Sequence, residues 1–311
     1  MRGRLTHVLA LTLALAACAN RPAVSIPDET NAASQEAAPV SIDDSHGVPT
    51  ASSAAASSPS PSPSPVASPQ LPPPSASPVP TPKPGAVTMV PILMYHYIRE
   101  LPRNTPDQLG YGLSISPKLF DDELTYLADA GYDSVSMDDV ANHITRGSPL
   151  PAKPIVLSFD DGYADFYTAA WPSLKKHHLS ATVYLVVNFL GRPGYMSWQQ
   201  AQELRDAGVE IGAHTMDHVD LAIQPAAQAK RQIGDSRRIL QQHLNAPVDA
   251  FAYPSGRYTP AVVKMVADAG FTSAVTTKFG SRHTAANILT LARVRVPGGI
   301  AMPNFIRNLK G

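Results

Sequence analysis

Cysteine is almost absent from this sequence. Cys18 is the single cysteine among 311 residues, so no disulfide can form within the chain. Charged residues are also scarce at 16%, and the 25 Lys and Arg residues balance the 25 Asp and Glu residues. No basic stretch interleaved with aromatic residues occurs, which argues against a nucleic-acid partner. After the first 18 residues, no apolar run is long enough to span a membrane.

The first 18 residues have the layout of a secretory signal, with a basic start, an apolar run over 8–15 and small residues before Cys18. The LAAC segment at 15–18 resembles the lipobox of bacterial lipoproteins, whose cysteine is acylated. We predict a lipoprotein signal peptide over 1–18 with lipidation at Cys18; a free cysteine in a signal cleaved further on is the alternative. The expected location is the cell envelope, lipid-anchored and facing outside the cytoplasm, and Ala19 favours the outer membrane in a Gram-negative cell.

Proline is concentrated in the next segment. Residues 19–85 consist mainly of Ala, Ser and Pro, with repeated Ser-Pro pairs over 58–65 and no helical or strand period. Such a composition cannot bury a core, so we predict a disordered linker. Proline-rich chain extends by about 3.1 Å per residue, which allows a reach of up to roughly 200 Å. The linker is either a spacer with no role of its own or a tether that crosses a cell wall.

Residues 86–311 are long enough for one domain with a sizeable core. Short apolar runs alternate there with amphipathic segments, and several of these carry helix-start signals, such as Ser197 followed by Gln200, and Thr259 followed by Pro260. This alternation predicts an α/β fold with a parallel sheet, either open and doubly wound or closed as a (β/α) barrel, and we favour the barrel. The predicted strands are 90–95, 155–159, 181–187, 209–213, 250–253, 271–276 and 289–296.

Two adjacent carboxylates, Asp160 and Asp161, end the second of these strands. Consecutive side chains at a strand end point in different directions, so one carboxylate can bind a metal while the other faces the attacking water. The alternative is that one of them caps a helix beginning near Ala164, with Gly162 supplying a turn.

Two histidines, His214 and His218, follow the fourth strand. In a helical turn this spacing places both imidazoles on one face, where they can bind one ion. Together with one carboxylate they leave positions open for water and substrate, as catalytic metal sites do. We read the remaining histidines of the domain as surface residues: His143, His177, His178, His243 and His283.

The SFDDG segment at 158–162 and the HTMDH segment at 214–218 resemble the NodB-homology polysaccharide deacetylases, the fourth carbohydrate esterase family. The resemblance extends over about 90–296 and implies a distorted (β/α) barrel. It also implies that Asp160 is the catalytic base, and that a divalent metal is bound by Asp161, His214 and His218.

The third motif, FAYPSG at 251–256, departs from the family pattern because it lacks the arginine that orients the catalytic carboxylate. Arg293 could substitute from the last strand; a surface or structural arginine is the alternative. Ser255 matches the family's oxyanion donor through its backbone N–H.

The family's late leucine–histidine motif also has no match after Leu289. The segment PILMYH at 91–96 resembles the opening strand of the poly-N-acetylglucosamine de-N-acetylases, where such a histidine is the general acid. His96 is therefore either the general acid or a core histidine. We assign substrate binding to three aromatic residues near the motifs, because aromatic rings stack on sugars: Tyr163, Tyr253 and Trp198.

These observations predict a metal-dependent hydrolase that removes N-acetyl groups from an N-acetylglucosamine-containing polysaccharide. An O-acetyl esterase, a non-catalytic envelope-binding lipoprotein and an amidase of small substrates are the alternatives. Zinc suits two histidines and a carboxylate, as do cobalt and nickel. The expected partners are the acetylated polysaccharide and, through the lipid anchor alone, a membrane. We expect a monomer.

Overall fold

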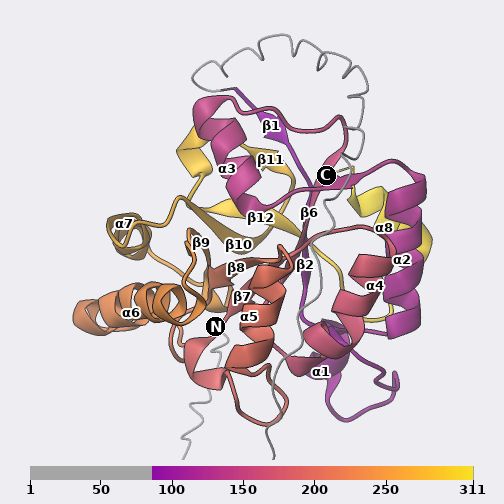
Figure 1. The fold of residues 1–311 in the computed structure, drawn as a ribbon, viewed down its shortest axis with the longest axis horizontal. Coiled ribbons are helices and arrows are strands. Elements are labelled where there is room, and N and C mark those ends of the chain that lie inside the picture. The colour runs from indigo at the N-terminus through magenta and orange to yellow at the C-terminus, as the bar shows by residue number, and fades with distance from the viewer. Residues whose placement is uncertain (1–85, 311) are drawn as a thin grey trace, which may run out of the picture. The chain divides into compact units, whose positions relative to one another are not determined.

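The computed structural model describes residues 86–310, so Cys18, the predicted signal peptide over 1–18 and the predicted linker over 19–85 lie outside the described residues. Within 86–310, seven parallel strands form a ring in the order β2–β12–β10–β9–β8–β7–β6, and pairing of β6 with β2 closes it (Figure 1). The strands are β2 (Ile92–Tyr95), β6 (Pro154–Phe159), β7 (Thr182–Leu185), β8 (Glu210–Ala213), β9 (Ala250–Ala252), β10 (Ser273–Phe279) and β12 (Leu291–Arg295).

Each of these seven strands overlaps one of the predicted strands, and the prediction of a closed barrel is confirmed. The first and last strands decide between the open and the closed sheet. β12 pairs with β2 through Val294 and Leu93, and β2 pairs on its other edge with β6. An open sheet would leave β2 without one of these two neighbours.

Helices surround the barrel, with α2 beside α4 on one side and α6 beside α7 on the other (Figure 1). Two predicted helix starts are confirmed. Ser197 and Gln200 form a capping box at α5, and the Thr259 side chain accepts a hydrogen bond from Val262 at α7. The helices are α1 (Gln108–Leu113), α2 (Pro117–Asp129), α3 (Met137–Arg146), α4 (Trp171–Lys176), α5 (Trp198–Asp206), α6 (Ala226–Leu244), α7 (Pro260–Asp268) and α8 (Met302–Asn308).

Short strands lie outside the ring. Strand β5 (Asp133–Ser134) pairs with β6, while β3 (Tyr97–Ile98) pairs with β4 (Ser114–Ile115). Strands β1 (Thr88–Met89) and β11 (Arg282–His283) form an antiparallel pair. This pair contains His283, for which the prediction of a surface position is wrong. His283 is fully buried rather than on the surface, because its Nε2 lies 2.8 Å from the Val90 carbonyl oxygen.

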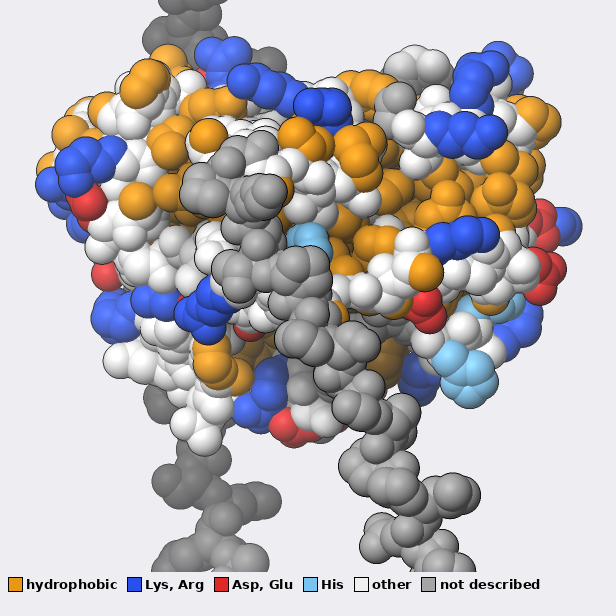
Figure 2. Space-filling model, turned by 90° about the horizontal axis from the view of Figure 1, so that it is seen from above, with side chains coloured by type: hydrophobic (Ala, Val, Ile, Leu, Met, Phe, Trp, Pro, Cys, Tyr) orange, Lys and Arg blue, Asp and Glu red, His pale blue; other side chains and the backbone are white. Residues whose placement is uncertain are grey.

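The face seen in Figure 2 carries a broad area of hydrophobic side chains, and its Lys and Arg side chains are scattered rather than gathered into one basic patch. None of the helices within residues 86–310 is both long and apolar enough to cross a membrane.

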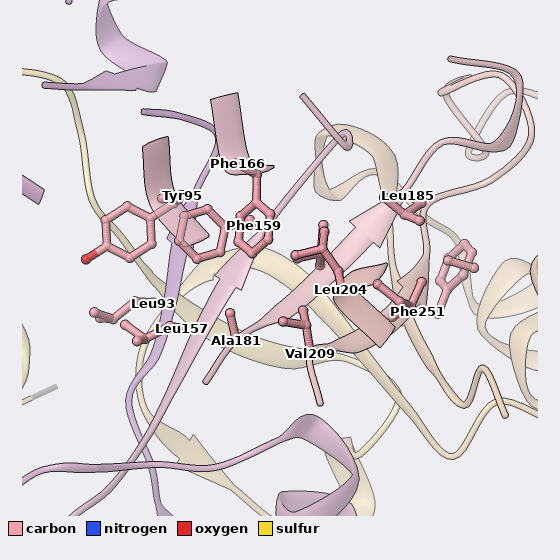
Figure 3. Close-up of a cluster of buried hydrophobic side chains, with 14 of the residues drawn as sticks. Leu93, Tyr95, Leu157, Phe159, Phe166, Ala181, Leu185, Leu204, Val209 and Phe251 are labelled. Carbon is pink, nitrogen blue, oxygen red and sulfur yellow. The ribbon is translucent and has the colours of Figure 1, made fainter. Parts of the chain in front are cut away.

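The main core lies between the barrel and the surrounding helices, where apolar side chains from several strands meet (Figure 3). Tyr95 at the end of β2 stacks on Phe159 at the end of β6 with ring centroids 5.1 Å apart, and Phe166 packs edge-on against Phe159 at 4.7 Å. Because side chains alternate along a strand, these outward rings direct the next residues, His96 and Asp160, toward the barrel interior. Packing of the core thus positions the polar side chains at the strand ends.

Candidate active site

A cavity of about 340 Å³ opens at the carboxyl ends of the barrel strands, which is where barrel enzymes carry their chemistry. Several predicted site residues follow directly on a strand there: His96 after β2, Asp160 and Asp161 after β6, and His214 after β8. The fold therefore brings together residues from distant parts of the chain. The cavity is lined by His96, Leu109, Leu113, Asp160, Asp161, Tyr163, His214, His218, Ser255, Thr277 and Arg295.

Three of these residues form a cluster that can hold a metal ion. One ligand atom each from Asp161, His214 and His218 lies within 4.8 Å of the others. The Asp161 Oδ1 atom is 3.4 Å from His214 Nε2 and 3.3 Å from His218 Nε2. This carboxylate oxygen is buried and has no hydrogen-bond partner within the described residues, which fits a group arranged to coordinate a cation. A carboxylate with two imidazoles is a ligand set suited to zinc and similar ions.

The orientation of His214 also favours coordination. Its Nδ1 lies 2.7 Å from the carbonyl oxygen of Ala252 in β9, so Nδ1 carries the proton and donates it there. The lone pair of Nε2 is then directed toward Asp161 and the cavity. A backbone acceptor of this kind fixes the tautomer of metal-binding histidines in many proteins.

The 214–218 segment is a turn and not the helical turn that the spacing predicted. Thr215 and His218 have positive φ angles of 70° and 56°, and the Thr215 Oγ1 atom accepts a hydrogen bond of 2.9 Å from the His218 N–H. The buried Gln232 of α6 stabilises the turn, because its Oε1 accepts hydrogen bonds from the backbone N–H groups of Met216 and Asp217 at 3.1 and 3.0 Å. The imidazoles converge because the turn is tight.

Left-handed backbone recurs throughout the site. Asp161 and Ser255 also have positive φ angles, 74° and 53°, which are unfavourable for residues with a Cβ atom. Such strain persists only where surrounding contacts impose it, and it is concentrated at functional sites. Gly162 follows at φ 78°, and a Cβ atom there would lie 2.9 Å from the Leu185 side chain. The turn after β6 thus requires glycine at this position.

Asp160 is held by Arg293 of β12. The guanidinium donates two hydrogen bonds, from Nη1 to Oδ1 at 2.8 Å and from Nη2 to Oδ2 at 2.7 Å. Burial alone would raise the pKa of Asp160, but the charge and hydrogen bonds of Arg293 lower this pKa well below the usual range. Asp160 is therefore ionised, and it is not a helix cap. Arg293 takes the place of the arginine missing from the third motif, and the alternative of a surface residue is wrong because Arg293 is 1% exposed.

Arg293 is itself fixed by further hydrogen bonds inside the barrel. Its Nε donates to the Thr276 carbonyl oxygen at 2.9 Å, and its Nη1 donates to Ser158 Oγ at 3.2 Å. Ser158 in turn donates to the Leu93 carbonyl oxygen at 2.6 Å. Strands β2, β6, β10 and β12 therefore contribute jointly to the orientation of Asp160. A non-catalytic binding protein would not need this arrangement around a carboxylate that is not one of the three residues of the metal cluster.

His96 lies on the other side of Asp160. Its Nε2 is 3.8 Å from Asp160 Oδ2, and its side chain is 13% exposed and lines the cavity. Burial lowers the pKa of His96 below its usual value, although Asp160 and Asp161 oppose this effect. His96 is therefore not a core histidine, since it reaches the same cavity as the carboxylates.

The three predicted substrate-binding aromatics have different environments. Tyr163 lines the cavity and stacks on Tyr97, with ring centroids 3.6 Å apart. The prediction for Tyr253 is wrong, because its ring is fully buried and its hydroxyl donates to the Leu289 carbonyl oxygen. Trp198 does not line the cavity either. Its ring stacks on His243 at 4.2 Å, so it packs between helices as the first residue of α5.

The fold and the cavity define a class of protein, namely a (β/α) barrel with a candidate hydrolytic metal site at its strand ends. Comparison with known proteins identifies the family. The model of the polysaccharide deacetylase family matches residues 147–274. YxkH of Bacillus subtilis, which is named as a polysaccharide deacetylase, is 30% identical over 224 residues, covering 71% of this chain and 77% of YxkH. This chain therefore belongs to the polysaccharide deacetylases, enzymes that remove acetyl groups from polysaccharides.

Two further comparisons inform the site. The Streptococcus pyogenes deacetylase PplD, solved in complex with acetate, has the same fold with a TM-score of 0.67 and 30% identity, covering 73% of this chain and all of that chain. The poly-β-1,6-N-acetyl-D-glucosamine N-deacetylase of Escherichia coli is 29% identical over 119 residues, which is 33% of this chain and only 18% of that protein. The similarity to the Escherichia coli protein is therefore confined to a part of each chain.

Proposed function

We propose that this enzyme hydrolyses N-acetyl groups of an N-acetylglucosamine-containing polysaccharide of the cell envelope or extracellular matrix. The observation that carries the proposal is the placement, in one cavity, of the Asp161–His214–His218 cluster beside the oriented Asp160 and His96. The name of the Escherichia coli relative supports an amide-linked acetyl group on glucosamine. The acetate of the PplD complex is the acid that such a reaction releases.

Asp161, His214 and His218 would hold a divalent ion, for which zinc is our first candidate and cobalt or nickel the alternatives. When bound, the ion supplies Lewis-acid polarisation of the acetyl carbonyl and of the attacking water. Asp160 is positioned to take the proton of this water, because Arg293 leaves it ionised and fixed at the edge of the metal cluster.

The remaining roles belong to Ser255 and His96. Ser255 lines the cavity after β9, and we assign its backbone N–H to the oxyanion that develops as the acetyl carbon becomes tetrahedral. We assign His96 to protonation of the departing amine, since it is the imidazole of the cavity that lies outside the metal cluster. Tyr163 would contact the sugar ring.

We also propose that the enzyme acts on the outside of the cytoplasm as a lipid-anchored monomer. The lipobox-like segment ending at Cys18 and the proline-rich composition of residues 19–85 support an anchor followed by a spacer. A tethered enzyme has better access to a fixed polymer than to a diffusing metabolite.

An acetate-release assay tests the function. The mature chain, with its metal content measured on the same sample, is incubated with chitin oligomers, poly-N-acetylglucosamine, peptidoglycan and acetylated xylan. Release from the first three with loss of activity after chelation is the expected result. Release from acetylated xylan alone would replace the amidase assignment by an O-acetyl esterase, and no release from any polymer by the metal-loaded protein would refute the proposal.

A further inference from the structure

Strand β12 carries a second arginine, Arg295, two residues beyond Arg293. Side chains repeat on one face of a strand with a period of two, so both arginines face the barrel interior. Arg293 lies inside the barrel against Asp160, whereas Arg295 lies one step further along the strand, is exposed and lines the cavity. The two residues therefore differ in depth, and Arg295 stands at the mouth of the active site.

Within the described part of the chain, no carboxylate oxygen lies within 4.0 Å of the Arg295 side chain, and no side-chain hydrogen bond forms there. Some other arginines of the domain are paired with carboxylates. Arg237 binds Asp249 at 2.6 Å, and Arg257 contacts Asp220. Arg295 is the arginine that lines this cavity, and it has no carboxylate partner among the described residues.

The carboxylates that line the cavity are engaged by other groups. Asp160 is occupied by Arg293, and Asp161 faces His214 and His218. Neither carboxylate therefore neutralises Arg295. Burial lowers the pKa of His96, and the positive charge of Arg295 acts in the same direction. The exposed and unpaired guanidinium of Arg295 is therefore available to a carboxylate of a ligand bound in the cavity.

We propose that Arg295 binds a carboxylate of the polysaccharide close to the acetylated sugar, so that the preferred substrates are acidic N-acetylated glycans rather than neutral ones. This inference rests on the deacetylase function proposed above and specifies its substrate class. A guanidinium at the rim of a cavity binds a carboxylate with two parallel hydrogen bonds. Leu109 and Leu113 line the same cavity and offer apolar contact to the carbon face of a sugar ring.

The test compares glycans that differ in charge alone. Peptidoglycan strands freed of their peptides carry lactyl carboxylates, and hyaluronan oligomers carry uronic acid carboxylates. In each case the neutral counterpart is the same glycan after carbodiimide coupling to methylamine. We expect a kcat/KM that is about fivefold higher on at least one acidic glycan than on its neutral form, the size expected for a partly exposed charged contact. The glycan with the larger ratio identifies the type of carboxylate.

Variants assign the preference to Arg295. Arg295→Gln should reduce the ratio of kcat/KM on the acidic glycan to that on its neutral form to about one. Arg295→Lys should retain part of this ratio, because lysine keeps the positive charge but cannot donate two parallel hydrogen bonds. Arg282→Gln, which removes an exposed arginine outside the cavity, is the matched control and should keep the full ratio. Binding of both glycan forms to the chelated, metal-free protein, measured by calorimetry, should give the same ranking without any turnover.

Three results would overturn the inference. The first is equal activity of the wild-type enzyme on acidic and neutral glycans. The second is an Arg295→Gln variant that keeps the preference. The third is a variant whose kcat falls equally on both forms with KM unchanged, which would make Arg295 a transition-state contact. Failure of the proposed function is distinguishable from all three, because acetate would then be released from no glycan, neutral chitin oligomers included.

Discussion

Arg293 and Asp160 form a doubly hydrogen-bonded ion pair inside the barrel, with N–O distances of 2.8 and 2.7 Å, although 133 positions separate them in the sequence. Both side chains are almost completely buried. A buried charge is tolerated only when it is paired, so each residue requires the other. The pair joins the strand that is followed by the proposed catalytic carboxylate to the last strand of the barrel.

Removing one member of this pair should therefore destabilise the protein. We expect Arg293→Gln to lower the free energy of unfolding by about 3 kcal/mol, because Asp160 is left as an unpaired buried charge. The double variant Asp160→Asn/Arg293→Gln should recover part of this loss, since no unpaired charge remains. Chemical denaturation of the wild type, of the single variants Arg293→Gln and Asp160→Asn, and of the double variant measures the effect. Additive losses in the double variant would show that the two side chains are not coupled.

The two adjacent aspartates should give different phenotypes. Asp161→Asn removes a charged ligand, so metal content measured by mass spectrometry should fall. Asp160→Asn should retain the metal and lose acetate release, because the base is lost and the cluster stays intact. Asp129→Asn, an exposed change at the end of α2, is the control. Full metal content and substantial activity in both site variants would remove the basis for the enzyme assignment.

His96→Ala tests the proton donor. General acid catalysis typically contributes about 10²- to 10⁴-fold, so hydrolysis of the N-acetyl amide should fall by that order. An activated phenyl acetate should be affected much less, because its leaving group departs without a proton. Metal content and melting temperature should change little. Equal losses on the two substrates would instead indicate a role in binding or architecture.

Stability should decrease with rising pH because of Glu123. Burial raises the pKa of this carboxyl to about 8, although the Tyr95 hydroxyl donates a hydrogen bond to it at 3.0 Å and opposes the shift. Between pH about 4.5 and 8, the folded state therefore retains a proton that the unfolded state has already released. The stability that the neutral carboxyl contributes at low pH is lost as the pH rises through this range. Glu123→Gln should make the free energy of unfolding less dependent on pH.

Urea denaturation at pH 5, 6, 7 and 8 in the presence of a chelator measures this dependence. The chelator removes the separate contribution of metal binding, and the difference between wild type and Glu123→Gln isolates the single carboxyl. Parallel curves for the two proteins would mean that Glu123 titrates alike in the folded and unfolded states.

The predicted anchor is tested by Cys18→Ala. Without the thiol no acyl chain can be attached, so the protein should move from the membrane fraction to a soluble or precursor form and fail to incorporate a fatty-acid probe. Unchanged fractionation together with unchanged labelling would exclude lipidation at this residue.

Much of the barrel is predictable because buried parallel strands are short apolar runs between amphipathic helices, and such runs are visible locally. The placement of His96, Asp160 and His214 at the cavity follows from their positions directly after strands. The role of Arg293 is undecided from sequence because its partner lies far away in the chain. Its position between apolar residues of β12 is a signal, since a charge within a buried strand requires a buried counter-charge.

The predictions that are wrong concern residues whose environment is set by contacts or backbone geometry that the local sequence pattern does not show. The polar local sequence of His283 indicates a surface residue, yet its hydrogen-bond acceptor is Val90, 193 positions away. Tyr253 lies in a motif, which suggests a contact with substrate. Its ring instead packs against Phe251 and Tyr258 in the main core between the barrel and the helices. The helical spacing expected for His214 and His218 does not account for the left-handed Thr215 between them.

The joining of β12 to β2 also has a consequence for when the enzyme becomes competent. The guanidinium that orients Asp160 belongs to the last strand of the ring, whereas Asp160 itself is made 133 residues earlier. While the chain is being synthesised, the Asp160 carboxylate exists without its counter-charge until Arg293 has been added. The proposed catalytic base is therefore oriented only when the barrel closes, and we expect chains that lack β12 to be inactive.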